Sequence, residues 1–153
     1  MKPVGFAYER PRDLGEASRL LADESVAAKI VAGGQSLGPM LNLRLAQVEL
    51  LVDIAGIPEL SAVSDEGESM VLGAGITHAA FEDRRCPDPT GGVLATVAEG
   101  IAYRAVRNRG TIGGSVAHAD PAADWVTTLS ALGAEVLVCG SGGERSAAIP
   151  TLM

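Results

Sequence analysis

Two pairs of adjacent glycines, Gly33-Gly34 and Gly113-Gly114, constrain the fold of this chain more than any other feature of its sequence. Glycine makes up 19 of the 153 residues, about 12% against a usual 7%. The glycines gather in short groups beside apolar runs, so they mark turns between regular elements and not a low-complexity tail. We therefore expect short strands and helices joined by tight turns that expose several backbone amides together.

The composition indicates one folded domain or two small lobes. Hydrophobic residues make up 47% of the chain and charged residues 20%, which excludes a disordered chain. No run of about 18 apolar residues is free of charges or glycine clusters, so we predict no membrane span. The first residues lack the apolar core of a secretory signal, and we expect a cytoplasmic protein.

The charge balance excludes a nucleic-acid partner. Twelve Lys and Arg residues against nineteen Asp and Glu give a net charge of −7, whereas binding a phosphate backbone needs a clustered positive field. Arg104, Arg107 and Arg109 do cluster, but aromatic residues are 3% of the chain. Cys86 and Cys139 have no second cysteine or histidine at ligand spacing, so we predict free thiols and no metal site.

Capping residues and apolar periodicity predict four helices. They run from Asp13 (the N-cap) to Leu21, from Thr77 (the N-cap) through Phe81, from about residue 90 to residue 100, and from Asp120 (the N-cap), with Pro121 in the first turn, to Gly133. The last of these carries Trp125, Leu129 and Leu132.

Short apolar runs predict the strands. We expect a buried strand at 29–31, a second at 50–54, a hairpin of 61–64 with 69–72, and a second hairpin of 134–139 with 144–149. Helices mixed with hairpins favour an α+β fold over a doubly wound parallel sheet.

The first glycine segment follows the expected strand at 29–31 and leads into Gln35 and Ser36. A chain that turns sharply at two glycines can present a concave set of amides, which binds an anion without a basic side chain. Gln35 and Ser36 can add side-chain donors. A simple turn from strand to loop explains the segment equally well. The absence of Gly-Lys-Ser/Thr excludes a P-loop.

The second glycine segment, residues 110–115, has hydroxyl residues on both sides of the glycine pair. The first glycines of the two pairs lie 113 − 33 = 80 residues apart, which suggests one ligand held by two loops. A diphosphate suits this arrangement, because hydrogen bonds to charged groups contribute about 1.5–3 kcal/mol each. Asp124 can accept from a sugar hydroxyl, or it can be a first-turn charge that complements the helix dipole.

The two histidines indicate little chemistry of their own. His78 follows Thr77 at an expected helix start, so a surface or capping role is favoured over catalysis. His118 follows the second glycine segment, and a place near the ligand is expected. No residue pattern identifies a nucleophile or a metal ligand set.

Six segments together resemble one family, the flavoprotein (medium) subunits of the molybdenum hydroxylases, which include the carbon monoxide dehydrogenase medium subunit and the flavin domain of xanthine dehydrogenase. The segments are 32–40 (AGGQSLGPM), 43–45 (LRL), 51–54 (LVDI), 73–75 (GAG) with 77–78 (TH), 106–115 (VRNRGTIGGS) and 118–124 (HADPAAD). The likeness runs from about Pro3 to Ile149 and keeps the order and spacing of both glycine segments.

The resemblance implies a two-lobed FAD-binding domain of the PCMH type, with residues 1–55 as the first lobe and residues 56–153 as an incomplete second lobe. It implies FAD contacts at Val31, Ala32, Gly33, Gly34, Gln35, Ser36, Leu37, Ile101, Gly110, Thr111, Ile112, Gly113, Gly114, Ser115, His118, Asp120 and Asp124. Gln35 stands where some relatives of this fold attach flavin covalently to a histidine, so we expect non-covalent FAD. No catalytic residue of its own is expected, because the cofactor carries the redox chemistry.

The resemblance also implies two partner subunits. A large subunit with a molybdenum (molybdopterin) cofactor oxidises the substrate, and a small subunit with [2Fe-2S] clusters passes electrons to FAD, which hands them to a terminal acceptor. The family's C-terminal domain is not in this sequence. Two alternatives stay open: a non-catalytic assembly module that keeps the fold without tight FAD binding, and a module that binds a phosphorylated small molecule without redox function.

Overall fold

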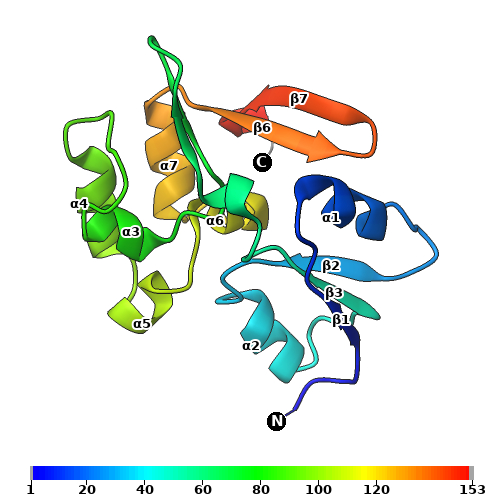
Figure 1. Ribbon diagram of the computed structural model, residues 1–153. Coiled ribbons are helices and arrows are strands. Elements are labelled where there is room, and N and C mark those ends of the chain that lie inside the picture. Colours follow the sequence, from blue (N-terminus) through cyan, green and yellow to red (C-terminus); the bar gives the residue numbers. More distant parts are fainter. Residues whose placement is uncertain (1, 152–153) are drawn as a thin grey trace.

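The computed structural model describes residues 2–151, which form three small β-sheets with helices packed around them (Figure 1). The strands are β1 (Ala7–Glu9), β2 (Ala28–Val31), β3 (Leu50–Asp53), β4 (Val63–Asp65), β5 (Met70–Leu72), β6 (Glu135–Gly140) and β7 (Gly143–Ala148). The helices are α1 (Leu14–Leu21), α2 (Leu37–Asn42), α3 (His78–Glu82), α4 (Val93–Gly100), α5 (Arg104–Arg107), α6 (Ile112–His118) and α7 (Asp124–Ala131), with 3-10 turns η1 (Pro58–Ser61) and η2 (Ile149–Thr151). The mixed α+β class is as predicted.

The first sheet has the order β1-β3-β2, and all of its pairs are parallel. Strand β3 lies in the centre, where Leu51 faces the cluster that contains Leu41 of α2 and Val52 faces the cluster that contains Ala17 of α1. Successive side chains of a strand point to opposite faces, so α1 and α2 cover the two faces of this sheet (Figure 1). Burial on both faces explains why β3 reads as a continuous apolar run.

The expectation that the strand at 29–31 is buried was wrong. Strand β2 is an edge strand, and Ile30 is 48% exposed. Strand β1 was not predicted, because three residues are too few to show a periodic pattern. The parallel pairing of β1, β3 and β2 was not predicted either, because turn residues between adjacent strands indicate antiparallel hairpins and give no sign of parallel pairs.

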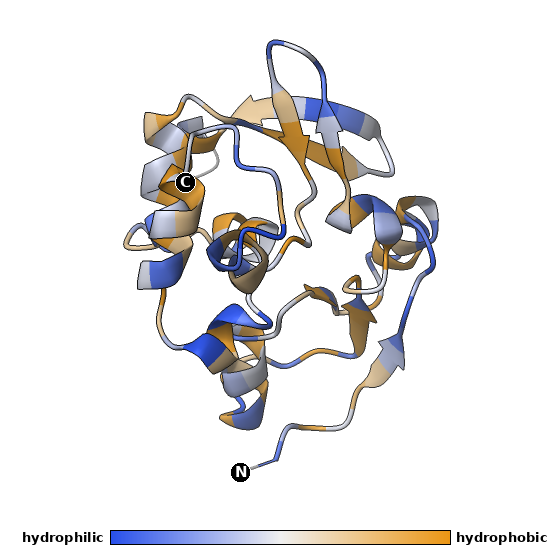
Figure 2. Cartoon of the chain, turned by 60° about the vertical axis from the view of Figure 1, so that its left-hand side comes forward, coloured by the Kyte–Doolittle hydropathy of each residue, from blue (hydrophilic) through white to orange (hydrophobic). Residues whose placement is uncertain are grey.

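Both predicted hairpins are present. Strands β4 and β5 pair antiparallel, and so do β6 and β7. Strand β4 begins at Val63 and not at Ser61, because Pro58–Ser61 forms a 3-10 turn. The tip of the β4–β5 hairpin is strongly hydrophilic and projects from the molecule (Figure 2).

Two of the predicted helix caps are confirmed and two helix starts are corrected. The Asp13 carboxylate accepts from the amide of Glu16 at 2.7 Å, and Thr77 Oγ1 accepts from the amide of Ala80 at 3.2 Å. Helix α4 begins at Val93, three residues late, because Gly91 and Gly92 adopt φ values of +71° and +113° that are not helical.

Asp120 is not the N-cap of the last long helix. Helix α7 begins at Asp124, and the Asp120 carboxylate accepts from the amide of Ala122 at 2.9 Å in the turn that precedes it. The amide of Ala123 donates to the Asp120 carbonyl at 2.9 Å, which closes the turn. The Asp120-Pro121 pair therefore forms an Asx turn, a local conformation that competes with helix capping.

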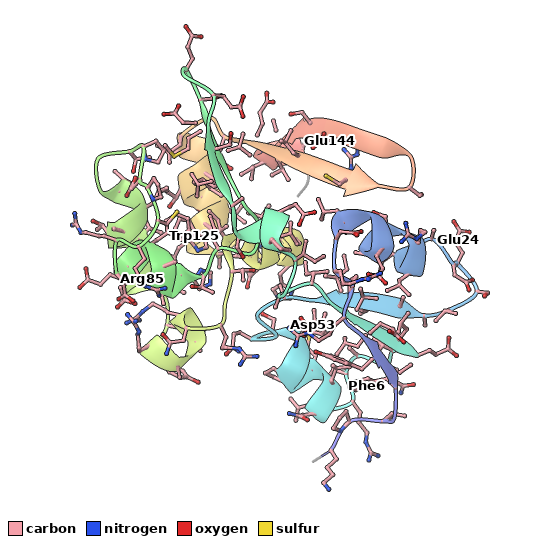
Figure 3. The ribbon with its side chains drawn as sticks, viewed as in Figure 1. Phe6, Glu24, Asp53, Arg85, Trp125 and Glu144 are labelled. Atoms are coloured by element: carbon pink, nitrogen blue, oxygen red, sulfur yellow. The ribbon has the colours of Figure 1, made fainter. Side chains whose placement is uncertain are left out.

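The largest core cluster surrounds Trp125, which is fully buried (Figure 3). It joins α3, α4, α6 and α7 through the buried residues Ile76, Phe81, Leu94, Ala98, Ile112 and Trp125. Ile57 packs with Val52 and Ala17 against the first sheet, so this cluster extends past residue 55. The division into lobes at that residue stays a prediction.

No helix within residues 2–151 combines the length and the apolar character needed to cross a bilayer.

A buried histidine lies in the Trp125 cluster, which corrects the expected surface or capping role of His78. The side chain of His78 is 5% exposed, and its Nδ1 atom accepts from Trp125 Nε1 at 2.9 Å. Burial, and secondarily the positive charge of Arg107, lowers the pKa of His78 to about 4 from its ordinary value of 6.5. The imidazole is therefore neutral in the folded protein at neutral pH.

This lowered pKa predicts acid destabilisation. Between pH 6.5 and pH 4, His78 is protonated in the unfolded chain but stays neutral in the folded protein. The free energy of unfolding therefore keeps this contribution above pH 6.5 and loses it as the pH falls toward 4. We expect a contribution of about 2.5 kcal/mol to the loss of unfolding free energy between pH 7.5 and pH 4.5. His78→Gln should remove that contribution, and His118→Gln, at the exposed second histidine, should retain it. Urea unfolding at pH 7.5 and pH 4.5 measures the free energy of unfolding of each protein. An equal loss of this free energy in wild type and His78→Gln would contradict the prediction.

Candidate functional site

The first glycine segment lies at the carboxyl edge of the parallel sheet, directly after β2. Gly34 has φ +68°, the left-handed region that favours glycine, and turns the chain toward α2. Gln35 Nε2 donates to the Gly33 carbonyl at 2.9 Å, so the Gln35 side chain folds back on its own loop. The expected sharp turn is therefore present.

The backbone amides of this segment are available to a ligand. Among residues 2–151, none of the N–H groups of residues 32–37 donates to an acceptor in the chain. Ser36 precedes α2, yet its side chain makes no capping hydrogen bond. Gln35 and Ser36 are exposed, and the rest of the segment is half-buried. An anion placed here would meet several unpaired donors.

The second glycine segment is different, because Gly113 and Gly114 lie in the first turn of α6 and not in a loop. The amide of Gly113 donates to the Ala74 carbonyl at 2.9 Å, and the amide of Gly114 donates to Thr111 Oγ1 at 3.0 Å. The amides of Ile112 and Ser115 are also bonded within the chain. A second cradle of free amides, expected from the glycine pair, is therefore not formed by these four groups.

The first glycine of each pair is required by close backbone packing. A Cβ atom on Gly33 would stand 2.1 Å from the Arg109 carbonyl oxygen and 2.8 Å from the Cα of Gly110. A Cβ atom on Gly113 would stand 2.4 Å from the Cβ of Ala74. The sequence suggested glycine for the approach of a phosphate, whereas these two positions are glycine because another segment of the chain already lies there.

The contact at Gly33 joins the two glycine segments. Arg109 immediately precedes the second segment and Gly110 begins it, so that segment and the free amides of residues 32–37 lie side by side. The sequence predicted that two loops 80 residues apart would share one ligand, and the structure brings the two segments into contact. It does so through Arg109, a residue that the sequence did not single out for this purpose.

The second segment is anchored by the chain that follows β5. Thr77 and Thr111 form an isolated antiparallel bridge, and the amide of His78 donates to the Gly110 carbonyl at 2.9 Å. A Cβ atom on Gly110 would stand 2.6 Å from His78 Nε2. His78 therefore supports the second segment, a role that the sequence missed because an isolated histidine after a capping threonine carries no signal of burial.

The other predicted site residues lie outside the two glycine segments. Ile101 is half-buried at the C-terminal end of α4. His118 ends α6, whose opposite end carries the glycine pair, and a helix of this length separates its ends by roughly 10 Å. Asp120 lies in the turn before α7, and Asp124 is exposed in the first turn of α7.

A polar cluster lies at the same edge of the first sheet. The Tyr8 hydroxyl donates to the carboxylate of Asp53, and Arg10 Nε lies 3.4 Å from the same carboxylate (Figure 3). The hydrogen bond to Asp53 raises the pKa of Tyr8. Asp53 also accepts from the amide of Ala55 at 3.0 Å. Its carboxylate is thus engaged in holding the ends of β1 and β3 together.

Comparison with known proteins shows which family this chain matches. Residues 4–153 match the family described as the FAD binding domain in molybdopterin dehydrogenase. The chain is 41% identical over 153 residues to the 6-hydroxypseudooxynicotine dehydrogenase complex subunit alpha of Paenarthrobacter nicotinovorans, an alignment that covers 100% of this chain and 52% of that protein.

Solved structures show the same fold. Carbon monoxide dehydrogenase from Hydrogenophaga pseudoflava, in a form that lacks the Mo-pyranopterin moiety, superposes with a TM-score of 0.90 at 40% identity, over 98% of this chain and 52% of that chain. Quinoline 2-oxidoreductase from Pseudomonas putida 86 superposes with a TM-score of 0.88 at 39% identity, over 97% and 52%. The chain thus spans about half the length of the relatives it matches.

The contact between Gly33 and Arg109 predicts a sharp cost for a side chain at residue 33. Gly33→Ala must push two backbone segments apart, and we expect it to lower the free energy of unfolding by about 1–3 kcal/mol. Gly38→Ala is the matched control, because a Cβ at that helical position meets nothing within 4 Å. It should leave stability unchanged or raise it by about 0.5–1 kcal/mol. Urea titrations of the three proteins decide, and a Gly33→Ala protein as stable as Gly38→Ala would contradict the packing argument.

Proposed function

Because the chain belongs to the family of FAD binding domains in molybdopterin dehydrogenase, we propose that it binds FAD non-covalently and transfers electrons as the flavoprotein part of a molybdenum hydroxylase. One observation carries the proposal: the unpaired amides of residues 32–37 lie directly beside residues 109–110 of the second lobe. A dinucleotide bound there would be held between segments far apart in sequence.

The first glycine segment fits the pyrophosphate of FAD. The amides of Ala32, Gly33, Gly34, Gln35, Ser36 and Leu37 are donors without acceptors among residues 2–151, and the Ser36 hydroxyl makes no capping bond. Neutral amides suit a diphosphate in a protein of net charge −7, because they attract the anion without a cationic side chain. We assign Val31 to the same wall, at the end of β2.

The second lobe supplies the other wall of the proposed site. Gly110, Thr111, Ile112, Gly113, Gly114 and Ser115 are assigned to this wall, where they contribute shape and side-chain hydroxyls. Gly114 is exposed and Ser115 is half-buried in the first turn of α6. A ligand can therefore rest on this turn even though its amides are already bonded. Ile101, His118, Asp120 and Asp124 are proposed for the parts of the dinucleotide beyond the pyrophosphate.

The proposed attachment is non-covalent because of the residue at position 35. A glutamine amide is not a nucleophile toward flavin, unlike a histidine imidazole. Gln35 Nε2 is also engaged with the Gly33 carbonyl at 2.9 Å, so this side chain shapes the loop. FAD supplies the reversible redox chemistry when it is bound, and this chain supplies binding, orientation and exclusion of water. No residue of the chain is assigned a catalytic proton transfer.

The proposed partners follow from the relatives. One relative is a subunit of a dehydrogenase complex, and another is a carbon monoxide dehydrogenase whose molybdenum cofactor, in the solved form, lacks the Mo-pyranopterin moiety. We propose that a small iron–sulfur subunit delivers electrons to this chain and that a large molybdopterin subunit oxidises the substrate, so the chain alone would not act on substrate. We place this complex in the cytoplasm, where free thiols such as Cys86 and Cys139 persist.

The positive φ of Gly34 provides a test of the amide cradle. A residue with a Cβ pays about 1–2 kcal/mol for the left-handed conformation, so Gly34→Ala should weaken FAD binding by roughly tenfold. Gly38→Ala, in the following helix, should bind FAD as the wild type does. Titration calorimetry with FAD, and the yellow absorption band of the bound flavin, measure both effects.

The same titrations discriminate the alternatives. Wild-type chain that stays colourless and binds no FAD, even when assembled with the iron–sulfur and molybdopterin subunits, would overturn the proposal in favour of an assembly module. Tight binding of ADP together with no binding of FAD would favour a module for phosphorylated small molecules. Binding of FAD by wild type and Gly34→Ala with equal affinity would remove the first glycine segment from the site.

A further inference from the structure

One arginine binds both a helix and a turn in the second lobe. Arg107 Nε and Nη2 donate to the two carboxylate oxygens of Glu82, at 2.8 and 2.9 Å. Its Nη1 atom donates to the carbonyls of Ile101 and Ala102, at 2.9 and 3.1 Å. The Arg107 side chain is 13% exposed. A single guanidinium thus ties the turn between α4 and α5 to α3.

The turn that Arg107 holds has an unfavourable backbone. Ala102 has φ +43°, and a residue with a Cβ pays free energy for that conformation. Tyr103, the next residue, is exposed and makes no capping side-chain bond. The carbonyls of Ile101 and Ala102, which precede and follow the Ala102 Cα, both accept from Arg107 Nη1. Such a conformation persists when its surroundings over-determine it, and these two bonds are the polar contacts that do so.

The clamped turn is continuous with the contact between the glycine segments. The amide of Val106 donates to the Tyr103 carbonyl at 2.9 Å, and the amides of Arg109 and Gly110 donate to the Val106 carbonyl at 3.0 and 2.7 Å. Residues 103–110 therefore form one hydrogen-bonded unit. The Arg109 carbonyl at its end is the atom that faces Gly33.

We propose that Arg107 is a positioning residue of the cofactor site: paired with Glu82, it fixes the segment of residues 101–110 and so sets the wall that this segment presents to the first glycine segment. The inference rests on the proposed function, since it assigns the site to FAD. Ile101 and Gly110, both assigned to that site, lie at the two ends of the segment that Arg107 holds.

The geometry requires arginine at this position. A guanidinium presents a planar fork of five N–H donors, which matches a carboxylate with one edge and leaves Nη1 for the carbonyls, whereas a lysine has three donors on one nitrogen. Arg104 of the same segment is the control, because it binds Glu82 at 2.8 Å, Asp83 at 2.6 Å and Asn108 Oδ1 at 2.9 Å, yet donates to neither carbonyl of the turn. Its side chain is 46% exposed.

The test compares Arg107→Lys with Arg104→Lys in the full chain. Without FAD, hydrogen–deuterium exchange of residues 101–110 should quicken at least roughly tenfold in Arg107→Lys and change little in Arg104→Lys. With FAD, Arg107→Lys should bind roughly tenfold more weakly and shift the visible circular dichroism of the bound flavin. Arg104→Lys should keep the wild-type affinity and spectrum.

The outcomes separate this inference from the proposed function. Unchanged exchange and unchanged FAD affinity in Arg107→Lys, or equal losses in both variants, would overturn the positioning role. Faster exchange in Arg107→Lys, together with a wild type that binds no FAD, would overturn the proposed function and the assignment of the clamp to a cofactor, while the clamp itself would stand. Should Arg107→Lys fail to fold, Glu82→Gln retains the bonds from Arg107 to the carbonyls, and it should show a smaller, same-direction change in both measurements; no change would contradict the pairing.

Discussion

The arrangement of the two glycine segments depends on the close approach of two backbone segments at Gly33, where a Cβ would stand 2.1 Å from the Arg109 carbonyl oxygen. No side chain lies between the two segments, so their separation is set by main-chain atoms that cannot change rotamer. The parallel sheet fixes Gly33 at the end of β2, and α5 fixes Arg109 through the Val106 carbonyl. The position of the first glycine segment against the second thus depends on the absence of a single methyl group at Gly33.

The two glycine pairs look alike in sequence and differ in what they do. Around Gly33-Gly34 the amides of residues 32–37 stay unpaired, whereas around Gly113-Gly114 the amides complete a helix turn and bond to Ala74 and Thr111. The difference arises because the second pair follows Thr111, which caps α6, and lies against the chain after β5. The amides of the first segment stay without partners in the described chain, whereas the second pair joins α6 to the chain after β5.

The sequence predicted what depends on local chemistry. The caps at Asp13 and Thr77 and both hairpins followed from residues close to one another in the chain. It could not predict α6, because two adjacent glycines argue against a helix unless packing, here on Ala74, demands them. Nor did it predict the buried His78, whose partner Trp125 lies 47 residues away. Tertiary contacts decided these elements, and no short window of sequence contains them.

Two arginines of the segment that leads to Gly110 are engaged with carboxylates. Arg104 and Arg107 lie in the cluster that first suggested a positive patch, yet both are paired with carboxylates of Glu82 or Asp83. These pairings lower the pKa of Asp83 to about 2 and that of Glu82 below its usual range, so the carboxylates stay charged at neutral pH and keep the guanidiniums engaged. These two arginines hold neighbouring segments of the chain together, and the unpaired donors near Gly33 are backbone amides, which attract an anion at short range without a cationic side chain.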